Sequence, residues 1–185
     1  MICDQLAYAG FNVYLPDFQR GDPFNGDWPT FKPWVSKTPW SKVNADLQVL
    51  THHLKQNGAA SIGIMGFCWG SWVVFHASAS ADIKAGICVH PAIVKLSELF
   101  EENLDELVDH VKAPQLILNA GNDSDLFKEG GKYAVKLKER GLCEVVDYPD
   151  MTHGWVPRGN LSDPAVEAAV IDVTNRVIEY FQKHL

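Results

Sequence analysis

The sequence is short of the features that mark several large classes of protein. It has 16 Lys and Arg against 23 Asp and Glu, a formal net charge of −7, and no cluster of basic residues. Nucleic acid and anionic membrane surfaces are therefore not expected as partners. No segment approaches the roughly 18 uncharged apolar residues of a membrane span. The first residues show neither the basic segment nor the apolar core of a secretory signal.

Cysteine is also scarce. The four cysteines, at positions 3, 68, 88 and 143, form no C-x-x-C pair and show no metal-ligand spacing. No metal and no cofactor is therefore expected, and a reduced, cytoplasmic setting is the natural inference. The chain has 185 residues, of which 46% are hydrophobic and 21% charged. This composition predicts one folded domain spanning residues 1–185.

The most informative segment is a cysteine between two glycines, Gly66-Phe-Cys68-Trp-Gly70. An apolar run at 60–65 precedes it, and a helix-like stretch at 71–78 follows it. Strand, tight glycine-flanked turn and helix form the setting of a nucleophile elbow, in which the central residue stands on a strained turn. The alternative is a buried cysteine beside a glycine-rich bend, because free cysteine is among the most buried residue types.

Two further residues follow in the order that a catalytic triad on such an elbow requires, acid before histidine. A strand-like run at 114–120 leads to Asp123, and a second run at 143–148 leads to His153. Active sites of open α/β sheets lie at the carboxyl ends of the strands. Asp125 competes for the acid role, although the spacing after the first run favours Asp123. Asp123 could also be only a turn residue.

Strands and helices alternate along the chain, which predicts an α/β fold: a mostly parallel sheet with helices on both faces. The segment at 17–38 is rich in Gly, Pro and Trp, which predicts a long loop. The expected strands lie at 12–15, 60–65, 83–89, 114–120 and 143–148, and the expected helices at 39–57, 71–78, 96–110, 127–140 and from 163 to the C-terminus.

Gly66-Phe-Cys-Trp-Gly70, the Gly-x-Asp loop at 121–123 and His153-Gly-Trp155 together resemble the dienelactone hydrolase (carboxymethylenebutenolidase) family of the α/β-hydrolase superfamily. His90-Pro91 is similar to the eukaryotic-type branch. The resemblance implies an α/β-hydrolase fold that lacks its N-terminal strands here, with residues 1–9 as the end of the helix that follows them. The missing part would hold a second oxyanion-hole N–H and a Glu that contacts the resting thiol.

The same resemblance implies a reaction. Cys68 would attack the carbonyl of a small-molecule ester or lactone, His153 would take the thiol proton, and Asp123 would hold the His153 ring. The backbone N–H of Trp69 would donate to the oxyanion, and water would then hydrolyse the thioester. A helix N-terminus at Cys68 favours the thiolate. A monomer or a homodimer is expected.

The resemblance says less about the substrate. Arg20 and Arg158 fall near two arginines that bind the substrate carboxylate in bacterial members, each offset by one residue. Trp155 and His90 are candidates for the pocket wall, although packing is the more ordinary role for His90. The density of tryptophan suits an apolar or aromatic acyl group, or a sugar.

Two other functions compete with this hypothesis. Some relatives carry a glucanase label, but glycoside hydrolysis needs two carboxylates flanking the bond, and that reaction does not call for a Gly-x-Cys-x-Gly elbow. The alternative from another class is a non-catalytic or redox-sensing thiol domain that retains the hydrolase fold. Its motivation is the missing half of the oxyanion hole, and an accessible low-pKa thiol is what oxidants attack.

Overall fold

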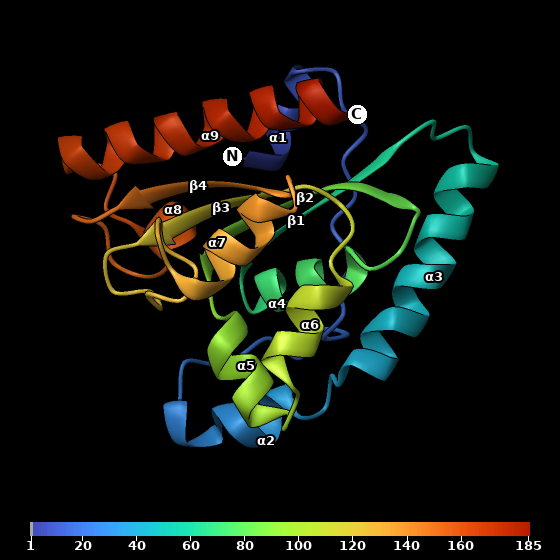
Figure 1. Cartoon of the computed structure of the whole chain (residues 1–185), viewed down its shortest axis with the longest axis horizontal. Helices are drawn as coiled ribbons and strands as arrows, with labels where there is room; N and C mark the ends of the chain where they lie inside the picture. Colours follow the sequence, from blue (N-terminus) through green and yellow to red (C-terminus); the bar gives the residue numbers. More distant parts are fainter. Residues whose placement is uncertain (1) are drawn as a thin grey trace.

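The computed structural model describes residues 2–185 and is built around a parallel sheet. Within those residues the sheet has four strands in the order β1-β2-β3-β4, and every adjacent pair is parallel. The strands are β1 Ile62–Cys68, β2 Ile83–Pro91, β3 Gln115–Ala120 and β4 Cys143–Tyr148. The expected parallel sheet is confirmed, and the carboxyl ends of its strands meet at one edge (Figure 1).

Helices cover both faces of the sheet (Figure 1). The strand order follows the chain order, so right-handed crossovers between successive strands place their helices on one face. That face carries α4 Trp69–Ala77, α5 Ile93–Leu99, α6 Leu104–His110 and α7 Lys132–Glu139, with α3 Trp40–Gln56 packed against the same core. The other face carries α1 Ile2–Tyr8, α8 Trp155–Arg158 and α9 Pro164–His184. Helices on both faces are as expected.

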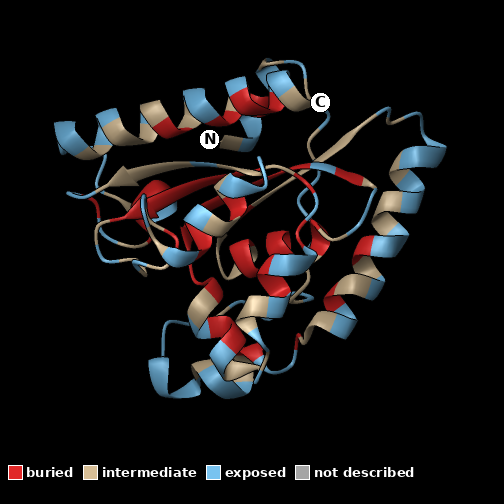
Figure 2. Cartoon of the chain, in the orientation of Figure 1, coloured by how far each residue is buried: buried red, intermediate tan, exposed pale blue. Residues whose placement is uncertain are grey.

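Each face buries its own apolar cluster, because successive side chains of a strand point to opposite sides of the sheet. In β2, Cys88 packs on the side of α4, whereas its neighbours Ile87 and Val89 pack on the side of α9. β3 repeats this alternation around Ile117. Figure 2 shows the two central strands buried and the edge strands β1 and β4 largely half-buried. The core therefore lies above and below β2 and β3.

Local signals account for the helices at the expected positions. α3 begins directly after Pro39 and ends before Gly58, which has φ +87. α9 begins at Pro164, and the Asp163 side chain accepts a hydrogen bond from the Ala165 N–H at 2.9 Å. The aspartate cap satisfies one free N–H of the first helical turn, and the proline that follows it has no N–H that needs a partner.

The strand expected at 12–15 is wrong. The structure assigns no strand to residues 11–16, and among the described residues β1 pairs only with β2. A strand is defined by its ladder of hydrogen bonds with a neighbouring strand. Because the segment at 12–15 has no such neighbour here, it is not a strand. Phe11 and Val13 instead pack against the cluster beneath α9.

The single helix expected at 96–110 is also wrong, because the structure has α5 and α6 there with a break between them. Glu101 in the break has φ +56, which no α-helix accommodates. The Asn103 side chain then accepts hydrogen bonds from the N–H groups of Asp105 and Glu106 at 3.1 and 3.3 Å. An asparagine cap inside an apparently continuous pattern is the physical reason for two helices.

Two other boundaries differ from expectation. The helix expected at 127–140 begins only at Lys132, because Gly130 has φ +77 and Gly131 is an extended N-cap. The segment expected as a loop at 17–38 contains the 3₁₀ helix η1 Trp28–Thr30 and the short helix α2 Phe31–Val35. Pro29 stands in the first turn of η1, where its missing N–H costs nothing.

β1 passes directly into α4 at Cys68, with no connecting loop. Cys68 has φ +51 and ψ −111, a conformation that is strained for a residue with a Cβ. Gly66 allows the turn to close, because a Cβ there would lie 2.2 Å from the carbonyl carbon and oxygen of Gly70. Ser71 Oγ donates to the Gly66 carbonyl oxygen at 2.9 Å and fastens the turn. The segment is therefore a strained strand-to-helix elbow.

Two glycine substitutions test this account of the elbow. Gly66→Ala should lower the free energy of unfolding by about 1–3 kcal/mol, because the new methyl group overlaps backbone. Gly70→Ala is the matched control: a Cβ there meets nothing within 4 Å and the residue is helical. It should leave stability unchanged or raise it by up to about 1 kcal/mol. Urea unfolding of both variants measures this, and equal losses in the two would contradict the close approach at Gly66.

Candidate active site

Cys68 stands at the carboxyl end of β1 and directly before α4. Its side chain is half-buried, so the thiol is not sealed in the core. The Trp69 N–H is the first of the helix, and the first N–H groups of a helix have no partner within it. Those N–H groups and the helix dipole both favour negative charge at this position. The elbow therefore offers a partly accessible sulfur beside a positive helix end.

Asp123 and His153 are brought together from the ends of two neighbouring strands. Asp123 follows β3, His153 follows β4, and Asp123 Oδ1 lies 2.6 Å from His153 Nδ1. The second oxygen, Asp123 Oδ2, accepts the Ala120 N–H at 2.7 Å. The Asp123 side chain is only 2% exposed, against 27% for His153. Both carboxylate oxygens are thus engaged, and the carboxylate faces the histidine.

The competing acid, Asp125, points elsewhere. Its side chain is 93% exposed and pairs with Lys128 Nζ at 2.8 Å. Lys128 also donates to the Gly121 carbonyl oxygen at 2.7 Å, which ties this surface pair to the base of the Asp123 loop. Of the two aspartates, Asp123 is the one that the structure places against His153.

The two loops are joined by contacts that sequence reasoning missed. Asn122 Oδ1 accepts the His153 backbone N–H at 2.7 Å, and the Gly121 N–H donates to the Met151 carbonyl oxygen at 2.8 Å. A Cβ at Gly121 would lie 2.0 Å from the Pro149 carbonyl oxygen. The only signal in the sequence was the Gly-Asn-Asp-Ser run, which indicates a turn without indicating its partner.

The charge state of His153 follows from its neighbours. Its pKa is raised to about 9, first by the hydrogen bond with Asp123 and then by interaction with the Cys68 thiol, while burial acts in the opposite direction. A raised pKa means that the ring keeps its proton through neutral pH and loses it as the pH rises through about 9. The imidazolium is therefore the form that faces Cys68 at neutral pH.

His90 lies against His153, and Trp155 lies against His90. His90 is fully buried, and its ring centroid is 4.9 Å from that of His153 and 5.4 Å from that of Trp155. Trp155 is 3% exposed and packs in the cluster on the α9 side. Burial lowers the pKa of His90 to about 3, so this ring stays neutral. His90 therefore packs against His153 inside the protein, whereas Trp155 packs against His90 and also belongs to the lining of the cavity beside His153.

The two candidate arginines have different surroundings. Arg20 is exposed and makes a two-pronged contact with the Asp46 carboxylate, with both N–O distances 3.0 Å. The Arg158 guanidinium lies over Gly154, where a Cβ would meet Nη2 at 2.1 Å. No carboxylate pairs with Arg158 in the described part of the chain. A cavity of about 380 Å³ is lined by His153, Arg158 and their neighbours at 150–166.

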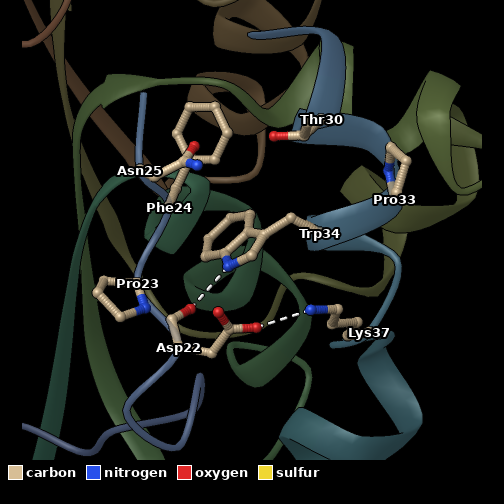
Figure 3. Close-up of a pocket in the computed structure, with 8 residues that line it drawn as sticks. All are labelled: Asp22, Pro23, Phe24, Asn25, Thr30, Pro33, Trp34 and Lys37. Atoms are coloured by element: carbon tan, nitrogen blue, oxygen red, sulfur yellow. Dashed lines mark hydrogen bonds and ion pairs between the residues drawn. The ribbon is translucent and has the colours of Figure 1, made fainter. Parts of the chain in front are cut away.

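A second cavity, of about 290 Å³, lies in the segment expected as a loop (Figure 3). Trp34 Nε1 donates to the Asp22 carbonyl oxygen at 2.7 Å, and the Asp22 carboxylate pairs with Lys37 Nζ at 2.7 Å. The Phe24 ring packs in tilted geometry against the rings of Trp34 and of the nearby Trp28. The lining of this cavity contains no residue of the Cys68, Asp123 and His153 group. The tryptophans are therefore spread over separate clusters and do not form one pocket.

Residues 2–185 contain neither a metal-binding cluster nor a membrane-spanning helix. Those residues hold no group of three or more His, Cys, Asp or Glu side chains placed to bind a metal ion. Over the same range, no helix combines the length and the apolar character that crossing a bilayer requires.

Comparisons with known proteins bear on the whole chain. The model of the dienelactone hydrolase family matches residues 1–185. Carboxymethylenebutenolidase homologs from Rattus norvegicus and Homo sapiens are 30% and 31% identical over the full chain, which spans 75% of each relative. A Zea mays protein named endo-1,3;1,4-beta-D-glucanase is 32% identical over 75% of the chain and 43% of its own length. The chain thus belongs to the dienelactone hydrolase family and has the α/β-hydrolase fold.

Proposed function

We propose that the protein hydrolyses an ester or lactone, with Cys68 as nucleophile, His153 as proton carrier and Asp123 as the group that orients His153. The observation that carries the proposal is the 2.6 Å contact between Asp123 and His153, beside a cysteine on an elbow. Family membership and the carboxymethylenebutenolidase homologs support a lactone or ester hydrolase as the reaction class.

The first half of the reaction forms a thioester. The Cys68 thiolate attacks the carbonyl carbon, and the electron pair of the C=O bond moves onto oxygen. The Trp69 N–H donates to that oxyanion, a contact of a kind worth about 10²–10³ in rate. When the C–O bond breaks, the His153 imidazolium gives its proton to the departing oxygen. The raised pKa of His153 supports this step, because the proton is already in place at neutral pH.

The second half releases the acid. His153, now neutral, takes a proton from water while the water oxygen attacks the thioester carbon. The C–S bond breaks, its electron pair returns to sulfur, and the thiolate again faces an imidazolium. Asp123 keeps the same ring orientation in both halves and accepts no proton itself. His153 therefore acts as acid in one half and as base in the other.

For the substrate, we propose an ester or lactone that carries a carboxylate. The support is Arg158, a cation that lines the same cavity as His153 and has no carboxylate partner in residues 2–185. Arg20 is the weaker candidate, because Asp46 already neutralises it. A guanidinium and a carboxylate match in geometry and can form two parallel hydrogen bonds.

Glycan hydrolysis, which the name of the Zea mays relative describes for that protein, is less well supported here. A glycosidase needs two carboxyl groups on either side of the bond. Asp123 is held by His153 and by the Ala120 N–H and is almost fully buried, so it does not reach a sugar ring. An ester or lactone needs only the thiol, the histidine and an oxyanion donor.

The role of the acid is tested by two matched substitutions. Asp123→Asn should lower kcat for p-nitrophenyl acetate by about 10²-fold or more, because the amide no longer fixes the imidazolium. Asp125→Asn removes the same charge two residues away at an exposed site and should stay within about twofold of wild type. Steady-state kinetics measures both. Loss of activity in Asp125→Asn alone would reverse the assignment of the acid.

The proposed substrate class is tested at the two arginines. Arg158→Ala should raise KM for an ester bearing a carboxylate by about tenfold, the loss of one charge-assisted contact, and leave KM for a neutral ester of the same size unchanged. Arg20→Ala is the control and should change neither value. If Arg20→Ala shows the selective effect, or if Arg158→Ala weakens both esters alike, Arg158 does not bind a carboxylate.

A further inference from the structure

His90 stands at an irregularity in the sheet directly beside the nucleophile. In the ladder between β1 and β2, Phe67 is opposite Val89 and Cys68 is opposite Pro91, so His90 is an extra residue without a partner. Such bulges occur next to active sites, where they redirect a side chain. His90 also has φ +38, in the region that favours glycine. The bulge turns this ring toward the end of the sheet where His153 lies.

Stability alone does not explain a histidine at this position. A side chain with a Cβ is strained at that φ, and glycine would relieve the strain. The ring is fully buried, and neither of its nitrogens has a hydrogen-bond partner among the described residues. Burying unpaired polar atoms is unfavourable, and glycine at this position would avoid that cost as well as the strain. Unfavourable features of this kind concentrate at functional sites.

The contacts of His90 indicate what the ring does. It meets His153 edge to face, at 4.9 Å between centroids and 65° between ring planes, and it rests on Trp155 and Phe67. Edge-to-face packing is a favoured arrangement of aromatic rings. The hydrogen bond to Asp123 fixes one nitrogen of His153 but leaves the ring free to tilt about that bond. The Cys68 thiol also interacts with the ring, and the edge-to-face contact of His90 adds an apolar support that neither polar partner supplies.

We propose that His90 is a positioning residue whose ring holds His153 in the plane that serves Asp123 and Cys68 together. The inference rests on the proposed function, since it assigns His90 a role only through His153. Burial, the charge of His153 and the charge of Arg158 all keep His90 neutral, with a pKa of about 3. A neutral ring supports the imidazolium without repelling it, and Asp123 and Cys68 are the groups that face the same imidazolium.

The test follows the thiolate–imidazolium pair through the reactivity of Cys68. The rate of Cys68 alkylation by iodoacetamide is measured at pH 7 and pH 10, by mass analysis of the peptide that contains Cys68. At pH 7 the thiolate depends on His153. At pH 10 His153 has lost its proton, and a cysteine thiol ionises without help from an imidazolium. A positioning defect therefore slows the reaction at pH 7 and not at pH 10.

Three variants distinguish loss of the contact between the His90 and His153 rings from a change in the backbone. His90→Gly removes the ring and keeps a backbone that tolerates the bulge, and we expect a 10- to 100-fold slower reaction at pH 7, roughly the cost of a small misplacement. His90→Phe keeps a ring and should stay within about threefold of wild type. Glu101→Gly, at φ +56 between α5 and α6, makes the same backbone change elsewhere and should have no effect.

Several other outcomes would contradict a positioning role for His90. The proposal is overturned if His90→Gly reacts as fast as wild type at pH 7, or is slowed equally at both pH values. An unfolded chain also loses rate at pH 7 alone, because its thiol has no imidazolium, so each variant is first shown by circular dichroism to keep the melting curve of the wild type. It is also overturned if His90→Phe is slowed as far as His90→Gly, because ring contact would then not hold His153. If wild-type Cys68 itself behaves as an ordinary thiol at pH 7, the triad fails first and the role of His90 fails with it.

Discussion

The short contact between Asp123 and His153 is the interaction through which the fold positions the reactive groups. Neither residue is near the other in sequence, and each stands on a loop just beyond a strand. They meet because β3 and β4 are parallel neighbours in register, with Ala120 opposite Tyr148 at the end of the ladder. The Asn122 side chain and the Gly121 N–H then tie the two loops together, each by a hydrogen bond to the backbone of the second loop. The position of the imidazole is thus set by the sheet and not by the loops alone.

The same edge of the sheet supplies the Cys68 sulfur and the His90 ring that packs against His153. β1 ends in the elbow at Cys68, and the next strand, β2, ends in the bulge at His90. Both residues have positive φ, so two adjacent strands end in strained backbone beside the same histidine. The buried clusters on the two faces hold these ends rigid. Strain that is concentrated at one edge of a well-packed sheet is what a pre-organised site requires.

Features that depend on local chemistry were predictable from the sequence. The elbow follows from two glycines around Cys68, the start of α9 follows from Asp163-Pro164, and the parallel sheet follows from alternating strands and helices. The strand expected at 12–15 failed because a strand needs a neighbour, which its own residues do not reveal. The helix expected at 96–110 failed because the Asn103 cap was hidden in a helix-like composition. Contacts between distant loops lie beyond any local pattern.

In the site, too, local features could be predicted from the sequence and contacts between distant segments could not. Spacing favoured Asp123 over Asp125, and the structure turns Asp123 toward His153 and Asp125 toward solvent. Sequence spacing treated Arg20 and Arg158 alike, whereas their surroundings differ because Asp46 lies beside only one of them. The bulge at His90 could not be predicted from the sequence, because register is a property of two strands. The residues of the site could therefore be predicted from the sequence, whereas the residues that they contact could not.

The most direct test of the account is intact-mass analysis of the protein during reaction with p-nitrophenyl acetate, with Cys68→Ala as the comparison. The account predicts a transient acetyl adduct on the wild-type protein, located on the peptide that contains Cys68, together with continued release of p-nitrophenol. It predicts neither adduct nor turnover for Cys68→Ala. A stable adduct without turnover would indicate a reactive thiol that is not a hydrolase. Equal turnover by the two proteins would contradict Cys68 as the nucleophile.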